Sequence, residues 1–357
     1  MDHAQKTAQT GINSQDGVMK PLLQGIESLA DWEIKQAQIR SNWLKMLGTP
    51  PIEGMNFEAG SDGSYEVISE AEEEDHRRLY IRYETRDGDT VFAYLLLPQQ
   101  SGEANKNHPA VLALHPTTEA GKSDISLKEG RDNRRYGLEL VKRGYVVLAP
   151  DSITFGDRVY EGENPFQTAP FYKRYPEWTA VGKMLADHIR GVDILVSLPQ
   201  VKANQIGVIG HSLGGYNGWF MAGIDRRIRA VVSSCGFSMF SGDPERNRWG
   251  RREWFSHIPS LTEEINRNHY SFEWHEIAAL AAPTPMFMWC GTRDKIFPNW
   301  RENVGGLADI ESLYRFLNKE QVFDCWFGAE GHDFPLDIRE RAYRFLDQHL
   351  GRLTVET

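Results

Sequence analysis

Residues 206–215 read Ile-Gly-Val-Ile-Gly-His-Ser-Leu-Gly-Gly, and this segment says more about the fold than any other in the chain. Residues 206–209 form a short apolar run typical of a buried strand, and Leu213–Ala222 follows with helical character. A Gly-x-Ser-x-Gly sequence between a strand and a helix predicts a sharp turn that presents the serine above the strand's carboxyl end. We therefore expect Ser212 to be a nucleophile. The alternative is a tight glycine turn with a bystander serine.

A serine nucleophile needs a general base, and the base needs an acid that orients it. When the nucleophile follows a strand in this way, the acid and then the histidine are expected on loops after later strands. Asp294 follows the apolar run Met286–Cys290, and His332 follows the apolar run Val322–Phe327. The order of these residues predicts a triad of Ser212, Asp294 and His332.

Other residues are weaker candidates for the same roles. Asp333 and Asp151 are the alternatives to Asp294 as the acid. A structural or surface role is the default expectation for the remaining histidines that we considered, which are His188, His211, His275 and His349.

An acyl-transfer site also needs two backbone N–H groups that bind the developing oxyanion. One is expected from Leu213, the residue after the nucleophile. The other is expected from the loop His115–Glu119, which follows the first buried strand. Pro116 has no N–H group, so Thr117 is the predicted second donor. An ordinary turn at the strand end is the alternative.

The rest of the chain alternates between apolar runs and helical segments. Further buried strands are predicted at Ala110–Leu114, Tyr145–Ala149 and Ile228–Ser233, and further helices at Tyr136–Arg143, Trp178–Leu198 and Ile338–Leu350. This alternation is typical of an α/β fold with a parallel sheet covered on both faces. Residues 64–100 instead predict antiparallel strands, with a hairpin turn at Asp87-Gly88.

The predicted organisation has three parts. They are a flexible arm at residues 1–20, an N-terminal helix and extension at 21–75, and a main domain at 76–350. The helix is predicted over Leu22–Leu47, with its tryptophan-bearing face docked on the main domain. Two stretches, 152–177 and 237–282, interrupt the alternation and are expected to be lid-like insertions.

The insertions and the strand-end loop supply candidate substrate-binding residues. These are His115, Phe155, Arg158, Trp249 and Trp254. Aromatic side chains suit a sugar ring or an aryl acyl group, and arginine suits an anionic substrate. The alternative is that the aromatic residues only pack the insertions onto the sheet.

Composition excludes several other classes of protein. The 357-residue chain has 40 basic and 50 acidic residues and a net charge of −10, which argues against a nucleic-acid partner. No apolar stretch has the length of a membrane span. No metal-ligand spacing or phosphate-binding loop is found, so we expect no metal and no cofactor.

The polar N-terminus lacks an apolar signal segment, which favours a cytoplasmic protein by default. A trimmed chain would be compatible with secretion or a periplasmic location. Homo-oligomers are compatible with the sequence.

The motifs together resemble the α/β-hydrolase superfamily over roughly residues 76–350. The segments that carry this resemblance are Leu112–Thr117, Arg143–Asp151, Gly210–Gly215, Gly291–Asp294 and Gly331-His332. Within the superfamily, Trp274–Ile277 followed by Ala282–Pro285 is similar to the dienelactone-hydrolase and acetyl-xylan-esterase-like branch. Dienelactone hydrolases use a cysteine nucleophile, whereas this chain has Ser212. The Arg-Gly-Gln motif that precedes the elbow in cephalosporin-C deacetylases is not found.

The resemblance implies a mostly parallel sheet of about eight strands with helices on both faces. It also implies hydrolysis of carboxylic esters through an acyl-enzyme, with a small-molecule or carbohydrate ester as substrate. Two alternatives remain open. One is a peptidase or amidase of the same fold, and the other is a catalytically silent binding protein.

Overall fold

The computed structural model describes residues 20–51, 62–99, 108–250, 254–256 and 258–351. The arm predicted at residues 1–20 therefore lies, except for Lys20, outside the described part of the chain. Among the described residues, no helix is both long and apolar enough to cross a membrane.

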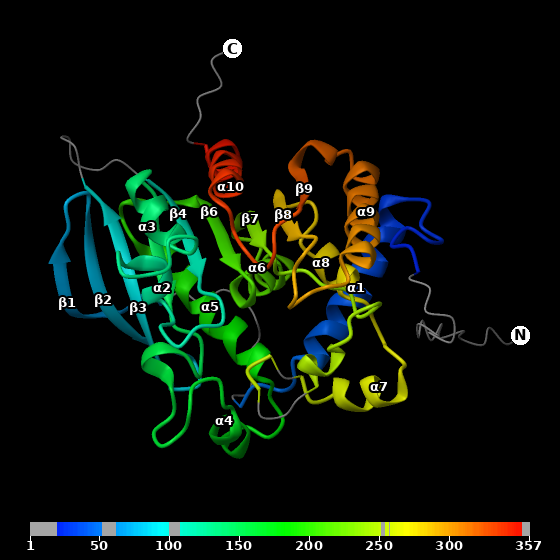
Figure 1. The fold of residues 1–357 in the computed structure, drawn as a ribbon, viewed down its shortest axis with the longest axis horizontal. Helices are drawn as coiled ribbons and strands as arrows, with labels where there is room; N and C mark the ends of the chain where they lie inside the picture. The colour runs from blue at the N-terminus through cyan, green and yellow to red at the C-terminus, as the bar shows by residue number, and fades with distance from the viewer. Residues whose placement is uncertain (1–19, 52–61, 100–107, 251–253, 257, 352–357) are drawn as a thin grey trace, which may run out of the picture.

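A single nine-stranded sheet runs through the molecule in the order β1-β2-β3-β5-β4-β6-β7-β8-β9 (Figure 1). The strands are β1 Glu66–Glu72, β2 His76–Glu84, β3 Thr90–Pro98, β4 His108–Leu114, β5 Val146–Pro150, β6 Val201–His211, β7 Ile228–Ser234, β8 Met286–Gly291 and β9 Phe323–Gly328. Pairing is antiparallel from β1 through β3 to β5, and parallel from β5 through β4 to β9. The predicted mostly parallel α/β-hydrolase sheet is confirmed, with nine strands rather than about eight.

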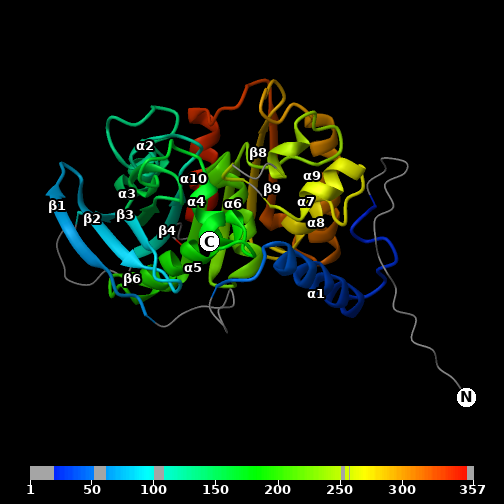
Figure 2. The ribbon, with the colours of Figure 1, turned by 90° about the horizontal axis from the view of Figure 1, so that it is seen from below.

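Helices cover both faces of this sheet. They are α1 Leu29–Met46, α2 Ser123–Ser126, α3 Tyr136–Lys142, α4 Ala169–Arg174, α5 Ala180–Ser197, α6 Leu213–Ile224, α7 Leu261–Arg267, α8 Trp274–Ala279, α9 Trp300–Phe316 and α10 Leu336–His349. The core under α3 and α10 is separate from the larger core under α1, α5, α6, α8 and α9. Figure 2 shows α3 and α10 on one side of the sheet and α1 and α5 on the other. Both faces of the central strands are therefore buried.

The N-terminal helix docks through its tryptophan face, as predicted, but begins later than predicted. Pro21–Gln24 form a turn, and Ser28 caps the first turn of α1 in a reciprocal pair with Asp31. The indole of Trp43 is fully buried and lies 4.8 Å from the ring of Phe220 in α6. The helix thus supports α6 from outside.

The two predicted insertions contact each other. Residues 152–177 contain the short 3-10 helix Gly156–Arg158 and α4, and residues 237–282 contain the 3-10 helix Arg246–Trp249, α7 and α8. Gln167 and Trp254 form an isolated antiparallel bridge between them. The boundaries that we assigned to these segments remain predictions.

Candidate active site

Ser212 lies at the turn between β6 and α6 in a strained backbone conformation. Its φ is 55° and its ψ is −116°, a region that residues other than glycine rarely adopt. A Cβ atom at Gly210 would lie 2.1 Å from the carbonyl carbon of Gly214, and a Cβ atom at Gly214 would lie 2.0 Å from the Leu114 oxygen. Only glycine fits at these two positions. The close approach of strand and helix therefore depends on the glycines on either side of the serine.

Asp294 and His332 meet across the ends of two neighbouring strands. Asp294 follows β8, His332 follows β9, and His332 Nδ1 lies 2.7 Å from Asp294 Oδ2. The other carboxylate oxygen accepts the backbone N–H groups of Ile296 and Phe297 at 2.7 and 3.1 Å. Burial would raise the pKa of Asp294, but the hydrogen bond from His332 and these two N–H groups lower it below its usual value. Asp294 is thus an ionised, firmly held partner for one side of the imidazole ring.

His211 packs against His332 from within the turn. The two ring centroids lie 4.7 Å apart, and His211 Nδ1 lies 2.9 Å from the Ser234 hydroxyl oxygen. Burial, with a contribution from His332, lowers the pKa of His211 well below its usual value. His211 therefore stays neutral and gives His332 an uncharged surface to pack against.

Ser212 and His332 line the same pocket, whose volume is about 420 Å³. Its other walls are Pro116, Thr117, Arg131, Arg134, His211, Tyr216, Glu245, Arg248, Trp249, Trp254, Phe255, Ser256, Ile296 and Phe297. Of the two predicted oxyanion donors, Thr117 lines the pocket, whereas Leu213 is buried directly after the pocket residue Ser212. Leu213 is the first residue of α6, where a helix leaves its N–H groups without intrahelical acceptors. The positive end of the α6 dipole favours negative charge at the same point.

Trp249 and Trp254 line the pocket, but the other three predicted substrate-binding residues do not. The His115 ring is buried, with Nδ1 2.8 Å from the Pro116 oxygen and Nε2 accepting the Ser152 N–H. Phe155 is buried against the rings of Phe166 and Phe255. These two residues belong to the interior, because their neighbours already cover them.

Arg158 is also a structural residue. Its guanidinium donates to Asp187 at 2.9 Å and to Asp89 at 2.6 Å, and its side chain is 4% exposed. A buried arginine with two carboxylate partners holds the first insertion in place and is not available to an anionic substrate.

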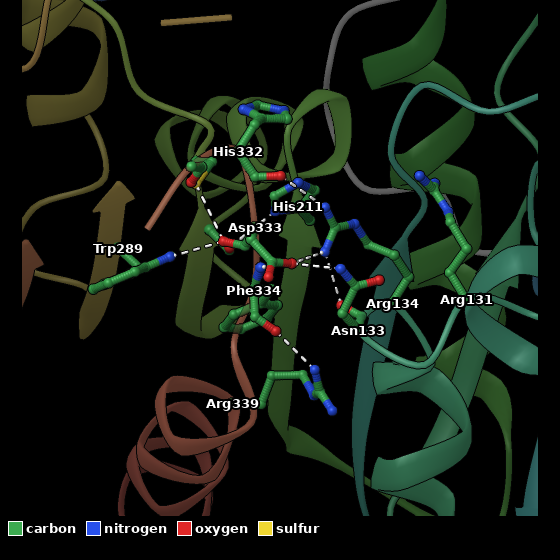
Figure 3. Close-up of polar contacts among 12 residues, drawn as sticks. Arg131, Asn133, Arg134, His211, Trp289, His332, Asp333, Phe334 and Arg339 are labelled. Atoms are coloured by element: carbon green, nitrogen blue, oxygen red, sulfur yellow. Dashed lines mark hydrogen bonds and ion pairs between the residues drawn. The ribbon is translucent and has the colours of Figure 1, made fainter. Parts of the chain in front are cut away.

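The two alternative acids have other partners. Asp333 Oδ1 accepts a hydrogen bond from Arg134 at 2.9 Å, and Figure 3 shows this carboxylate facing Arg134 and Asn133. Asp151 forms a buried ion pair with Lys122 at 2.7 Å. Asp294 is the one of the three candidates that is hydrogen-bonded to the His332 ring.

Several residues that line the pocket were not predicted from the sequence. Tyr216 lies one helical turn after Ser212 in α6, a spacing that could have identified it. Arg131, Arg134 and Arg248 gave no comparable signal, because distant loops bring them in. Each of these arginines is paired with an aspartate: Asp124, Asp333 and Asp243 respectively. Their charges are largely compensated, so they do not favour an anionic substrate.

Cys235, Asp294 and His332 form the one grouping of metal-ligand side chains found among the described residues. Burial raises the pKa of the Cys235 thiol to about 12, which disfavours the thiolate that a metal needs. His332 Nδ1 and Asp294 already bind each other. The donor chemistry at this point suits a hydrogen-bonded pair better than a metal ion.

A serine on a strained strand-to-helix turn, beside an Asp–His pair on a mostly parallel sheet, defines an α/β hydrolase. The chain belongs to the alpha/beta hydrolase family, whose sequence model matches residues 133–347. A curated relative is YtaP of Bacillus subtilis (strain 168), whose name describes it as a hydrolase by inference and gives no substrate. It is 30% identical over 249 residues, which cover 68% of this chain and 79% of YtaP.

Two solved structures share the fold. A glucuronoyl esterase from Solibacter usitatus has a TM-score of 0.65 at 17% identity, with 91% of this chain and 94% of that chain covered. An acetyl xylan esterase from Paenibacillus sp. R4 has a TM-score of 0.55 at 17% identity, with 92% and 98% covered. At this identity the similarity establishes the architecture alone.

Proposed function

We propose that this chain is a serine esterase that cleaves carboxylic esters of carbohydrates through an acyl-enzyme. The observation that carries the proposal is the 2.7 Å bond between His332 Nδ1 and Asp294, formed at the pocket that Ser212 also lines. With Nδ1 bound to the carboxylate, Nε2 is the ring nitrogen left to accept a proton.

In the proposed reaction, His332 Nε2 takes the Ser212 hydroxyl proton while Oγ attacks the ester carbonyl carbon. Asp294 holds the imidazole tautomer and stabilises its cation. The backbone N–H groups of Leu213 and Thr117 stabilise the tetrahedral oxyanion. His332 then gives its proton to the departing alcohol. Water, deprotonated by His332, releases the acid from Ser212 in a second round.

The choice of a carbohydrate substrate rests on two supports. Trp249, Trp254, Phe255 and Phe297 give the pocket an aromatic lining of a kind that can stack on a sugar ring. The two structural relatives are, by name, a glucuronoyl esterase and an acetyl xylan esterase. Trp249 and Trp254 are the residues that we assign to substrate contact.

The first experiment compares initial rates on p-nitrophenyl esters from acetate to octanoate for the wild type and Ser212→Ala. We expect Ser212→Ala to lose on the order of 10⁵-fold or more in kcat. The Cys235 thiol also lies near His332, but burial raises its pKa to about 12 and so disfavours the thiolate that could replace the serine. Ser233→Ala is the matched control, since it removes a buried serine hydroxyl from the end of β7, outside the pocket wall. It should keep wild-type rates.

Acetylated sugars and methyl esters of uronic acids then test the substrate class, and aminoacyl nitroanilides test amide hydrolysis. Faster turnover of anilides than of esters would replace the esterase proposal with a peptidase or amidase. A wild-type protein that neither turns over esters nor labels with a fluorophosphonate would be a binding protein. Full activity in Ser212→Ala would remove the assigned nucleophile.

A further inference from the structure

The loop that carries His332 is fixed by side chains of other elements. This loop joins β9 to α10 and forms no helix or strand of its own. The indole Nε1 of Trp289 donates to the Asp333 carbonyl oxygen at 2.9 Å, and Arg339 donates to the Phe334 carbonyl oxygen at 2.7 Å. Figure 3 shows these bonds converging on the loop from different elements. The main chain beside His332 is therefore held at successive carbonyl groups.

Arg134 holds the His332 residue itself. One guanidinium nitrogen donates to the His332 carbonyl oxygen at 2.9 Å, and the other donates to Asp333 Oδ1 at 2.9 Å. The Arg134 side chain is 5% exposed, whereas that of Asp333 is 40% exposed, so solvent reaches this pair mainly from the Asp333 side. A planar guanidinium can span two acceptors in a fixed geometry, which a single ammonium group cannot do.

Arg134 also connects His332 to a second segment that lines the pocket. The chain between β4 and α3 carries both Thr117 and Arg134, and both residues line the pocket. Asn133, beside Arg134, also donates to the Asp333 carboxylate. The segment that supplies the proposed oxyanion donor is thus tied to the loop that supplies the proposed base.

We propose that Arg134 is a positioning residue that sets the distance of the His332 imidazole from Ser212 through its bonds to His332 and Asp333. This inference rests on the proposed function, because it assigns a role within the same site. Asp294 fixes the rotation of the imidazole through Nδ1, whereas Arg134 fixes the backbone from which the imidazole projects. A misplacement of about 1 Å in a reacting group can cost about a hundredfold in rate.

The test variant is Arg134→Met, which keeps much of the side-chain length and loses all the donors. With p-nitrophenyl acetate, kcat should fall by about ten- to a hundredfold while KM changes by less than about threefold. Arg134→Lys should recover part of the loss, since one ammonium replaces only part of the fork. Asp333→Ala should lower kcat in the same way. If Arg134→Met does not fold, Arg134→Lys and Asp333→Ala still test the proposal.

Arg190→Met is the matched control. Arg190 of α5 is also a buried arginine that donates to a backbone carbonyl, that of Glu84, and pairs with an aspartate, Asp193. These partners lie outside the His332 loop, and Arg190 is not among the residues that line the pocket. Its loss should reduce the melting temperature about as much as the loss of Arg134, with kcat within about threefold of wild type. The double variant Arg134→Met/Asp333→Ala should be no slower than the slower single variant, because both substitutions break the same hydrogen-bonded pair.

Several results would overturn the positioning role. The first two are an unchanged kcat in Arg134→Met and a raised KM with kcat retained. The others are an equal kcat loss in Arg190→Met at equal loss of stability, and multiplicative losses in the double variant. A raised KM would instead make Arg134 a substrate contact. Failure of the esterase proposal is recognised separately, by the behaviour of Ser212→Ala.

Discussion

Ser212 illustrates how surrounding structure holds a single residue in an unfavourable conformation. A positive φ at a residue other than glycine costs about 1–3 kcal/mol and persists only where neighbouring structure determines it. Here the Ser212 backbone N–H donates to the Ser234 carbonyl oxygen at 2.8 Å, and the Ser212 carbonyl oxygen accepts the Tyr216 N–H at 3.0 Å. These bonds attach the turn to β7 on one side and to α6 on the other. The serine is therefore presented in a rigid setting before any substrate arrives.

Asp294→Asn tests how the His332 imidazole is oriented. An amide in place of the carboxylate can offer an N–H to Nδ1, which favours the tautomer with its proton on Nε2 and removes the base. We expect kcat for p-nitrophenyl acetate to fall by about 10³–10⁴-fold with little change in melting temperature.

Asp333→Asn is the control for this charge removal. Asp333 follows His332 directly, but its Oδ1 bonds to Arg134, and asparagine keeps that acceptor oxygen. Its kcat should stay within about tenfold of wild type. Equal losses in the two variants would show that charge near His332, and not contact with its ring, is what matters.

Helix α1 shows how one element acts at a distance from the chemistry. No residue of α1 lines the Ser212 pocket, within the part of the chain that the structure describes. Its Trp43 packs between Phe220 of α6 and Trp274 of α8, with the indoles of Trp43 and Trp274 5.9 Å apart. Since α6 begins at the strained serine turn, α1 stabilises the helix on which the nucleophile depends. It supports α6 and α8 from outside.

Trp43→Ala should lower the free energy of unfolding by about 3–5 kcal/mol, because it leaves a large cavity among aromatic side chains. Urea unfolding followed by circular dichroism measures the change. Ile34→Ala on the same helix is the control, since Ile34 is 72% exposed, and it should change stability by less than about 0.5 kcal/mol. Similar small changes in both variants would mean that α1 contributes little to the fold.

A buried charge network joins segments that lie far apart in the sequence. Lys183 of α5 pairs with Asp87 in the β2–β3 hairpin and with Asp187, while Arg158 of the first insertion pairs with Asp187 and Asp89. Removing one partner from such a network leaves a buried charge uncompensated. The network therefore fixes the first insertion against the hairpin and α5 across the molecule.

The pH dependence of stability should report on Asp89. Burial alone would raise its pKa, but Arg158 and Lys183 lower it to about 2. A carboxylate whose pKa is lower in the folded state stabilises the fold at pH values above its unfolded pKa of about 4. That contribution is lost as the pH falls from about 4 to about 2. After allowance for partial exposure, we expect it to be about 1–2 kcal/mol.

The measurement compares the free energy of unfolding of wild type and Asp89→Asn between pH 7 and pH 2. The difference should be largest above pH 4 and should shrink below it. Burial raises the pKa of the neighbouring Asp187 in both proteins, and this contribution cancels in the difference. Asp89 adds a smaller rise to the Asp187 pKa, which is absent from the variant. A difference that stays constant with pH would show that Asp89 does not titrate as described.

Local chain properties were enough to predict the fold class and most of its strands. The features behind these predictions each extend over only a few residues. They are the apolar runs of strand length, the glycines around Ser212 and the turn at Asp87-Gly88. β1 was harder to recognise, because all but one of its residues are exposed and it pairs through charges such as Glu66 with Arg82. Helix α9 was missed although Leu307, Ile310, Leu313 and Tyr314 follow helical spacing and are buried.

The order of the strands along the chain was likewise enough to predict that Asp294 and His332 act together. Parallel neighbours place their carboxyl ends at one edge of a sheet, so the loops after β8 and β9 lie side by side. Which side chains of the insertions reach the pocket was decided only by tertiary packing. Trp249 and Trp254 face the pocket, whereas Phe155 and Arg158 are buried by partners from distant segments. Arg134 gained its place beside His332 in the same way. Sequence patterns record local periodicity and turn chemistry, but a side chain's partner across the fold depends on how separate elements pack together.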